Sequence, residues 1–510
     1  MRRKISFHPF LFALYPVLRF WGLNRAEAYL QDTWRTIIFC LAAAGILYLL
    51  AMWFSRDGEK SALFSALCVV TFIYFGHIYY SIEGRIPYLG QIVFFLIAWL
   101  VFFLICLYLI FRLCRKCESL NTYLNAVSFV LILFPVIQLI WPPRLPSPVN
   151  HPILSPFNNQ TEKIDVSESR PDIYYIILDG YGRSDILREF FALDNSDFLD
   201  ALQQRGFYIA DRSNTNYTQT FLSMSSSMTG DYLDHAGIDP QSEDRRIIQQ
   251  YLDQNSYIHR FNRMGYETVT MTGSSPIDFN FADRSLAVSP ALNNFELGFQ
   301  SLTIARIWSR TAYEYVHWEV LQSELDVLQQ LPFNADHPQF VFAHLMAPHP
   351  PFVFDASGNF VPQNSFMAGD ASHYKGTREE YIRGYSLKVQ YLNTRVIEIV
   401  DHLMSNPYRP VVIILQADHG PGSYWDFDNL EGSCLHERLS IFNAYYIPYE
   451  NAREKLYPSI SPVNSFRLIF DQILDQPASL LDDLSYTSNW SHPYDFRDVS
   501  SQRETCSPIP

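Results

Sequence analysis

The stretch Ile173–Gly180, IYYIILDG, joins an unbroken apolar run to an aspartate and a glycine. A run of this length suits a strand better than a helix, and its isoleucines and tyrosines favour a strand that is buried on both faces. Asp179 and Gly180 then mark a turn at its carboxyl end. The stretch therefore predicts one strand of a sheet that is covered on both sides.

The rest of the C-terminal part alternates similar runs with amphipathic stretches. Further strands are expected at 267–271 (ETVTM), 339–346 and 411–415 (VVIIL), and helices at 184–205 and 381–404. Continuous apolar strands between helices are typical of a largely parallel sheet with helices on both faces. Residues 170–510 are therefore predicted to form one α/β domain.

The first part of the chain has a different character. Its apolar runs lie at roughly 7–23, 36–54, 61–79, 88–112 and 122–141. Each of the last four is long enough to cross a hydrocarbon core, which takes ~20 residues. The first run is shorter and carries Arg19, so it either spans with Arg19 reaching the interface or lies in the interface. Residues 1–141 are expected to be a transmembrane anchor, and the proline-rich stretch 142–169 a stiff linker.

Basic residues between the runs favour five spans over four. With a cytoplasmic N-terminus and five spans, the external loops carry only Arg25, Arg35 and Arg85, and the cytoplasmic side holds Arg2, Arg3, Lys4, Arg56, Lys60, Arg112, Arg115 and Lys116. Four spans would move the last three outside, against the positive-inside rule. We therefore expect a multi-pass protein of the cell membrane with its C-terminal domain outside the cytoplasm. The net charge of -14 argues against nucleic-acid partners.

Polar clusters come directly after three of the expected strands. Asp179 ends the first, His344 and His349 lie in AHLMAPHP at the end of another, and Asp418-His419 comes after VVIIL. Ligand sites in open α/β sheets form beyond the carboxyl ends of the strands, so these clusters should meet. Carboxylate oxygen and imidazole nitrogen are the ligands of zinc and manganese sites. A lone Asp-Gly is usually only a turn, but the clusters together predict a metal site.

A candidate nucleophile lies in 216–228, NYTQTFLSMSSSM, which is typical of a loop that enters a helix. A hydroxyl at a helix N-terminus has the helix dipole to stabilise its anion, and a metal beside it would lower its pKa. If the helix begins at about Phe221, Thr220 is its N-cap. Taken alone, however, the segment is more typical of a simple threonine N-cap than of a nucleophile.

Together these residues resemble the alkaline phosphatase superfamily in its sulfatase-like branch. Its membrane-anchored lipoteichoic acid synthases and phosphoethanolamine transferases, which carry five spans and an external α/β domain, are the most similar families. The resemblance implies that Asp179, Asp418 and His419 hold a divalent metal ion (manganese, zinc or magnesium). It also implies that Thr220, three residues before Ser223, is the nucleophile.

Further histidines are assigned by the same resemblance. Pro348-His349-Pro350-Pro351 resembles the Asn-His-x-Pro segment of these families, so His349 would bind substrate or a second metal. Leu435-His436 resembles a later Leu-His pair, although it lies farther from Asp418 than in those families. His344 would either assist the catalytic residues or be a hydrogen-bonded histidine of the core strand. The likeness is expected to concern the fold rather than sulfate-ester cleavage.

The implied activity is a two-step transfer. Thr220 would attack a membrane phospholipid donor and form a phospho-threonine, and an envelope glycan or lipid acceptor would then take the phosphoglycerol or phosphoethanolamine headgroup. One alternative is a phosphodiesterase or sulfuric-ester hydrolase that uses water. Another is a non-catalytic membrane scaffold, against which the joint presence of Asp179, Thr220, Asp418 and His419 argues.

Overall fold

The computed structural model describes residues 6–24, 30–82, 86, 91–113, 117–140, 170–271, 279, 281–286, 288, 292–363, 369–476 and 478–506. The chain divides into two compact units. The first consists of Met1–Leu145 and Ser289–Tyr313, and the second of Pro146–Val288 and Glu314–Pro510. The linker expected at 142–169 lies outside the described residues.

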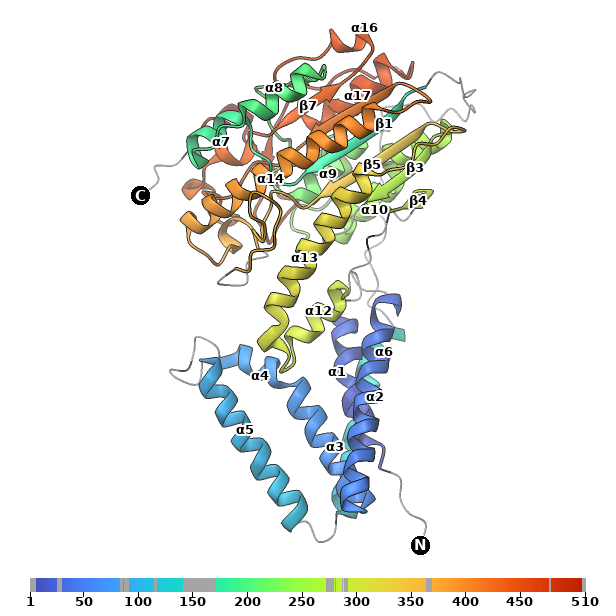
Figure 1. Ribbon diagram of the computed structural model, residues 1–510, viewed down its shortest axis with the longest axis vertical. Helices are drawn as coiled ribbons and strands as arrows, with labels where there is room; N and C mark the ends of the chain where they lie inside the picture. The colour runs from blue at the N-terminus through green and yellow to red at the C-terminus, as the bar shows by residue number, and fades with distance from the viewer. Residues whose placement is uncertain are drawn as a thin grey trace. The chain divides into compact units, whose positions relative to one another are not determined.

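The first unit is helical (Figure 1). Its helices are α1 (His8–Leu23), α2 (Leu30–Ser55), α3 (Gly58–Ile73), α4 (Phe75–Ile82), α5 (Ile92–Tyr108, extended by a π-turn at Leu109–Leu113), α6 (Glu118–Ile140) and α12 (Asn294–Ser301). Helices α1, α2, α3 and α6 pack against one another. Most large apolar side chains of α2, α5 and α6 stay exposed, as expected of surfaces that face lipid.

The five expected spans are not all confirmed. Among the described residues, three helices are long and apolar enough to cross a membrane: Leu30–Ser55, Ile92–Arg112 and Glu118–Ile140. Helices α3 and α4, bent by 42° at their junction, make a fourth if they are one span. The fifth expected span is α1, which has 16 residues. At 1.5 Å per residue it is about 24 Å long, short of a core about 30 Å thick.

A segment from the C-terminal half of the sequence completes the first unit. Asn293 and Glu296 form a capping box that starts α12. Glu296 also forms an ion pair with Arg35 of α2, and Phe295 packs on Phe20 of α1. No pattern in the sequence indicated that this segment would belong with the anchor.

The second unit contains a seven-stranded sheet in the order β2-β7-β6-β1-β5-β3-β4 (Figure 1). The strands are β1 (Asp172–Leu178), β2 (Tyr208–Ile209), β3 (Glu267–Met271), β4 (Arg284–Ser285), β5 (Gln339–Leu345), β6 (Val411–Gln416) and β7 (Asn443–Tyr446). Strands β4, β3, β5, β1 and β6 run parallel, and β7 and β2 add antiparallel pairings at one edge. A mostly parallel sheet is thus confirmed.

Helices cover both faces of this sheet. Alternate residues of β1 point to opposite sides, so Tyr174 and Ile176 enter one core and Ile173 and Tyr175 the other. The first core is closed by α7 (Ser184–Phe191), α8 (Ser196–Gln204), α13 (Arg306–Gln329) and α14 (Arg378–Met404). The second is closed by α9 (Thr220–Thr229), α10 (Arg246–Asn255), α11 (Tyr257–Arg263) and α17 (Pro462–Gln472). Smaller elements are α15 (Leu435–Leu439), α16 (Glu450–Arg453), β8 (Tyr486–Thr487) and β9 (Arg497–Asp498).

The expected elements agree with these bounds apart from two helices. The helix predicted at 184–205 is two helices, α7 and α8. Ala192 ends the first in a left-handed conformation with φ 48°, and Asp194 accepts a hydrogen bond from the Ser196 N–H where the second begins. The amphipathic pattern continues across the break, which is why the sequence did not show it. Helix α14 begins earlier than expected because Thr377 and Glu380 form a capping box.

Candidate active site

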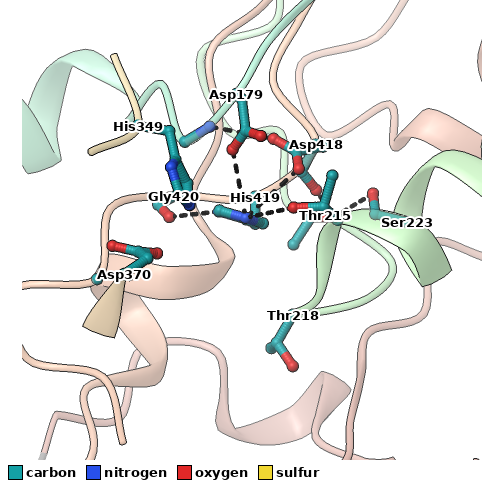
Figure 2. A network of polar contacts seen from close by, with 12 residues as sticks. Asp179, Thr215, Thr218, Ser223, His349, Asp370, Asp418, His419 and Gly420 are labelled. Carbon is teal, nitrogen blue, oxygen red and sulfur yellow. Dashed lines mark hydrogen bonds and ion pairs between the residues drawn. The ribbon is translucent and has the colours of Figure 1, made fainter. Parts of the chain in front are cut away.

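The Asp and His clusters lie together at the carboxyl edge of the sheet. Strand β1 pairs in parallel with both β5 and β6, so Ile177 is level with His344 on one side and with Gln416 on the other. The residues just beyond these positions therefore meet. Figure 2 shows Asp179, Asp418 and His419 close to one another, with His349 beside them.

Each of the two aspartates has one fixed oxygen and one open oxygen. Asp179 Oδ2 lies 3.1 Å from His344 Nε2, and Asp418 Oδ1 accepts a 3.0 Å hydrogen bond from the Gly180 N–H. Asp179 Oδ1 and Asp418 Oδ2 are buried and accept no hydrogen bond from the residues that the structure describes. They lie 3.6 and 3.4 Å from His419 Nε2. Buried, unpaired carboxylate oxygens are costly without a cation, so their chemistry fits a metal ion.

The His419 ring is oriented as a metal ligand would be. Its Nδ1 lies 2.9 Å from the Gly420 carbonyl oxygen, which can only accept. Nδ1 therefore carries the proton, and the Nε2 lone pair faces the two open carboxylate oxygens. Burial, followed by the Arg438 charge, lowers the pKa of His419, which favours the neutral ring.

His344 belongs to the same cluster. Asp179, His344 and Asp418 can place ligand atoms within 4.8 Å of one another. The hydrogen bond from its Nε2 to Asp179, however, makes His344 the group that orients Asp179. Burial lowers the pKa of His344, but the contact with Asp179 outweighs it, and the pKa is raised.

Thr220 is the hydroxyl that reaches this cluster. Helix α9 begins at Thr220, and Gln219 is its N-cap, so the expected N-cap position of Thr220 is wrong by one residue. Thr220 Oγ1 lies 3.1 Å from His419 Nε2. Thr218 Oγ1 instead contacts Thr487 at 3.2 Å, and Ser223 Oγ contacts Thr215 at 3.0 Å.

His349 lies beside the cluster, on the loop after β5. Its main-chain N–H donates a 3.0 Å hydrogen bond to the Asp179 carbonyl oxygen. Its ring centroid lies 6.4 Å from that of His419. The main-chain contact therefore holds this loop against the site and keeps the His349 ring close to the proposed metal ligands.

His436 lies in a different environment, at the start of α15. Its ring nitrogens lie 2.9 Å from a carboxylate oxygen of Glu504, 3.7 Å from one of Glu189 and 4.0 Å from one of Asp185. None of these carboxylates belongs to the cluster around Asp179. The structure thus brings His349 to the cluster and surrounds His436 with other acidic groups.

A buried ion pair that the sequence pattern did not reveal supports the site. Arg438 Nε donates to the Thr218 carbonyl oxygen at 3.0 Å. Its Nη1 donates to Asp370 Oδ2 at 2.6 Å and to the Gly420 carbonyl oxygen at 3.3 Å. Burial raises the pKa of Asp370, but the Arg438 charge outweighs it and brings the pKa to about 2. One guanidinium thus links the loop that carries Thr220 to the turn that carries His419.

The fold and the site define an enzyme of the alkaline phosphatase superfamily: a mostly parallel sheet with aspartates, a histidine and a hydroxyl at its carboxyl edge. The family model described as Sulfatase matches residues 171–454, which is more than half of the chain. The chain therefore belongs to the sulfatase family. A search of curated proteins finds no match.

Several solved structures are similar to this chain. The C-terminal periplasmic domain of EptC from Escherichia coli is 12% identical, with a TM-score of 0.41, over 64% of this chain and 91% of that one. The integral membrane lipooligosaccharide phosphoethanolamine transferase A from Neisseria meningitidis is 12% identical, with a TM-score of 0.40, over 92% and 95%. The phosphonate monoester hydrolase of Agrobacterium radiobacter is 15% identical, with a TM-score of 0.40, over 62% and 80%.

Proposed function

We propose that this protein is a metal-dependent membrane transferase. It moves a phosphoryl-linked headgroup, of phosphoglycerol or phosphoethanolamine type, from a membrane phospholipid to an external glycan or lipid acceptor. The observation that carries the proposal is the position of Thr220 Oγ1, 3.1 Å from His419 Nε2, beside two unpaired carboxylate oxygens. The apolar helices of the first unit suit a lipid substrate because they keep the enzyme at the membrane.

The chain supplies suitable ligands for a divalent cation. Asp179 Oδ1, Asp418 Oδ2 and His419 Nε2 would hold it, and two carboxylate oxygens with one imidazole nitrogen suit zinc or manganese. When bound, such an ion lowers the pKa of a neighbouring hydroxyl and stabilises negative charge on phosphoryl oxygens. His344 fixes the orientation of Asp179 through its hydrogen bond.

Two displacements complete the transfer. Thr220 Oγ1 gives up its proton and attacks the phosphorus atom of the donor; the Oγ1–P bond forms, and the bond from phosphorus to the lipid oxygen breaks as that oxygen takes up a proton. An acceptor hydroxyl then gives up its proton and attacks the phospho-threonine; the P–Oγ1 bond breaks, and Oγ1 regains a proton. The His349 ring has Nδ1 committed to the Pro350 carbonyl oxygen at 2.7 Å. This leaves Nε2 to pass the proton between leaving group and acceptor.

The proposal includes a catalytic domain outside the cytoplasm. The arginine and lysine distribution supports five spans with α1 as the first, inserted as a short helix. A disulfide joins Cys434 to Cys506 in the second unit. Structural disulfides form and persist mainly in oxidising compartments, which supports the same orientation.

Defined lipids test the proposal. The full-length protein in detergent with manganese is incubated with fluorescent phosphatidylglycerol or phosphatidylethanolamine, with and without an alcohol acceptor such as octyl glucoside. We expect diacylglycerol release and a headgroup-modified acceptor, both identified by mass spectrometry. Release that an acceptor neither accelerates nor diverts would show a hydrolase that uses water. Absence of turnover with every lipid, in a preparation that retains its metal, would refute the proposal.

A further inference from the structure

An arginine that the proposed mechanism does not use contacts the helix turn that carries the nucleophile. Arg245 precedes α10, and its guanidinium carbon is 4.4 Å from the ring centroid of Phe221 and 4.1 Å from that of Trp490. Phe221 directly follows Thr220 in the first turn of α9. The guanidinium therefore stacks on the residue adjacent to the proposed nucleophile.

The hydrogen bonds of Arg245 leave it without a charged partner. Nη1 donates to Gln219 Oε1 at 3.1 Å, and Nη2 donates to the Trp490 carbonyl oxygen at 2.7 Å. Within the described part of the chain, no aspartate or glutamate forms an ion pair with Arg245. A guanidinium has five N–H donors, so three remain for another partner.

The surroundings hold this half-buried guanidinium in place. Gln219 is buried, and its Nε2 donates to Ser488 Oγ at 3.1 Å and to the Asn489 carbonyl oxygen at 3.2 Å. These bonds fix the loop that carries Trp490. Trp490 itself is 43% exposed, although it stacks on Arg245. A stacked guanidinium with free donors loses little side-chain freedom on binding and matches the oxygens of a phosphate group.

The absence of a carboxylate partner sets Arg245 apart from its neighbour. The chain has 52 acidic and 38 basic residues, so an arginine has many carboxylates with which it could pair. The adjacent Arg246 does so, with its Nη2 2.5 Å from Asp244 Oδ2. Arg245 instead contacts two aromatic rings and two neutral oxygens, among them Phe221 and Gln219 on either side of Thr220 in the sequence, and its charge is not paired with a carboxylate.

We propose that Arg245 and Trp490 form a subsite for a second phosphate group of the substrate, apart from the phosphoryl group that Thr220 takes. The inference rests on the proposed function, because the second phosphate would belong to a phosphorylated acceptor. Charge-assisted hydrogen bonds of this kind are worth about 10- to 100-fold in affinity.

A binding experiment tests the subsite without turnover. Glucose 6-phosphate and glucose are titrated calorimetrically into the metal-loaded full-length Thr220→Ala protein. Adding Arg245→Gln, which keeps a planar group that can stack, should weaken glucose 6-phosphate binding at least about 10-fold. Adding Arg246→Gln, the same change of charge one residue away, should leave it unchanged. Equal affinities in the two double variants would overturn the subsite, whether or not the protein is a transferase.

A turnover experiment then tests whether the phosphate belongs to the acceptor. Wild type and Arg245→Gln are compared with octyl glucoside, octyl glucoside 6-phosphate and no acceptor, using the same fluorescent donor. An increase in KM for the phosphorylated acceptor alone would assign the subsite to the acceptor. An increase in donor KM without acceptor would show that Arg245 contacts the phosphate that Thr220 takes, and would overturn the proposal of a separate subsite. An equal loss with all three, together with a lowered unfolding temperature, would show that Arg245 only holds the Trp490 loop and would overturn the proposal.

Discussion

Thr220 Oγ1 lies 3.1 Å from His419 Nε2, although the two residues are 199 positions apart in the sequence. Two distant segments produce this contact. Helix α9 begins at Thr220 on one face of the sheet, and the turn after β6 carries His419 over the same edge. Asp179, Asp418 and His419 are buried beyond the ends of buried strands, so substitutions that keep side-chain size should change the chemistry without unfolding the domain.

Replacement of Thr220 by alanine should abolish turnover and leave metal content and folding intact, because only the covalent step needs the hydroxyl. Trapping with the fluorescent donor, followed by peptide mapping, should place the phosphoryl adduct on Thr220. Thr218→Ala is the matched control and should keep most activity, since Thr218 Oγ1 contacts Thr487. An adduct on Thr218 or Ser223 would show that another hydroxyl is the nucleophile.

Asp418→Asn should lower metal affinity by more than the ~10- to 100-fold typical of an outer-shell partner, because it removes an anionic ligand. The amide oxygen can still accept from the Gly180 N–H, so the fold should persist. Metal content by mass spectrometry and activity after chelation and re-addition of manganese measure the effect. Asp194→Asn, exposed just before the start of α8, serves as the control. Full metal content in Asp418→Asn would argue against the site.

Metal affinity should fall at acid pH. Burial and the Arg438 charge lower the pKa of His419 below its usual 6.5. A lowered pKa keeps Nε2 unprotonated down to a lower pH than in a free histidine, and a metal ligand must be unprotonated. Affinity should therefore decline at a lower pH than it would for a site built on an unperturbed histidine. Titrations with manganese between pH 5 and 8, near the range over which histidine titrates, measure this directly, and a decline that begins above pH 7 would contradict the assignment of His419.

The Cys434–Cys506 disulfide makes the location of the domain testable. Closing a loop of 72 residues should stabilise the domain by about 4 kcal/mol. Cys506→Ser should accordingly lower the unfolding temperature while kcat changes little. In intact cells, both thiols should resist maleimide labelling until a reductant is added. Free Cys434 and Cys506 in freshly lysed cells would place the domain in a reducing compartment.

The sequence was most informative where strand geometry alone decides the arrangement. Asp179, Asp418 and His419 lie together because parallel strands end at one edge, a rule that needs no knowledge of side-chain contacts. The break at Ala192 left no such signal, since the apolar pattern runs through it. The sequence did not point to Arg438 for a related reason. Its partners are Asp370 and two main-chain carbonyl oxygens. Because every residue has a carbonyl oxygen, a hydrogen bond to one leaves no pattern in the sequence.

Arg438 should act by positioning the nucleophile. Arg438→Lys keeps a charge for Asp370 but loses the fork that reaches Thr218 and Gly420 together. A displacement of about 1 Å can cost ~100-fold in rate, so kcat should fall by about that factor with little change in KM or metal content. Arg438→Met would leave Asp370 unpaired at a cost of about 3–5 kcal/mol, and it should fold poorly.

Arg467→Lys is the matched control for this prediction. Arg467 is also buried and also binds two carbonyl oxygens, those of Gly230 and Ser479, both at 2.7 Å. Gly230 caps the far end of α9, so this contact holds the helix without reaching Thr220. Both lysine variants should lose some thermal stability, but only Arg438→Lys should lose kcat. Equal kcat losses in the two variants would mean that Arg438 matters for folding alone.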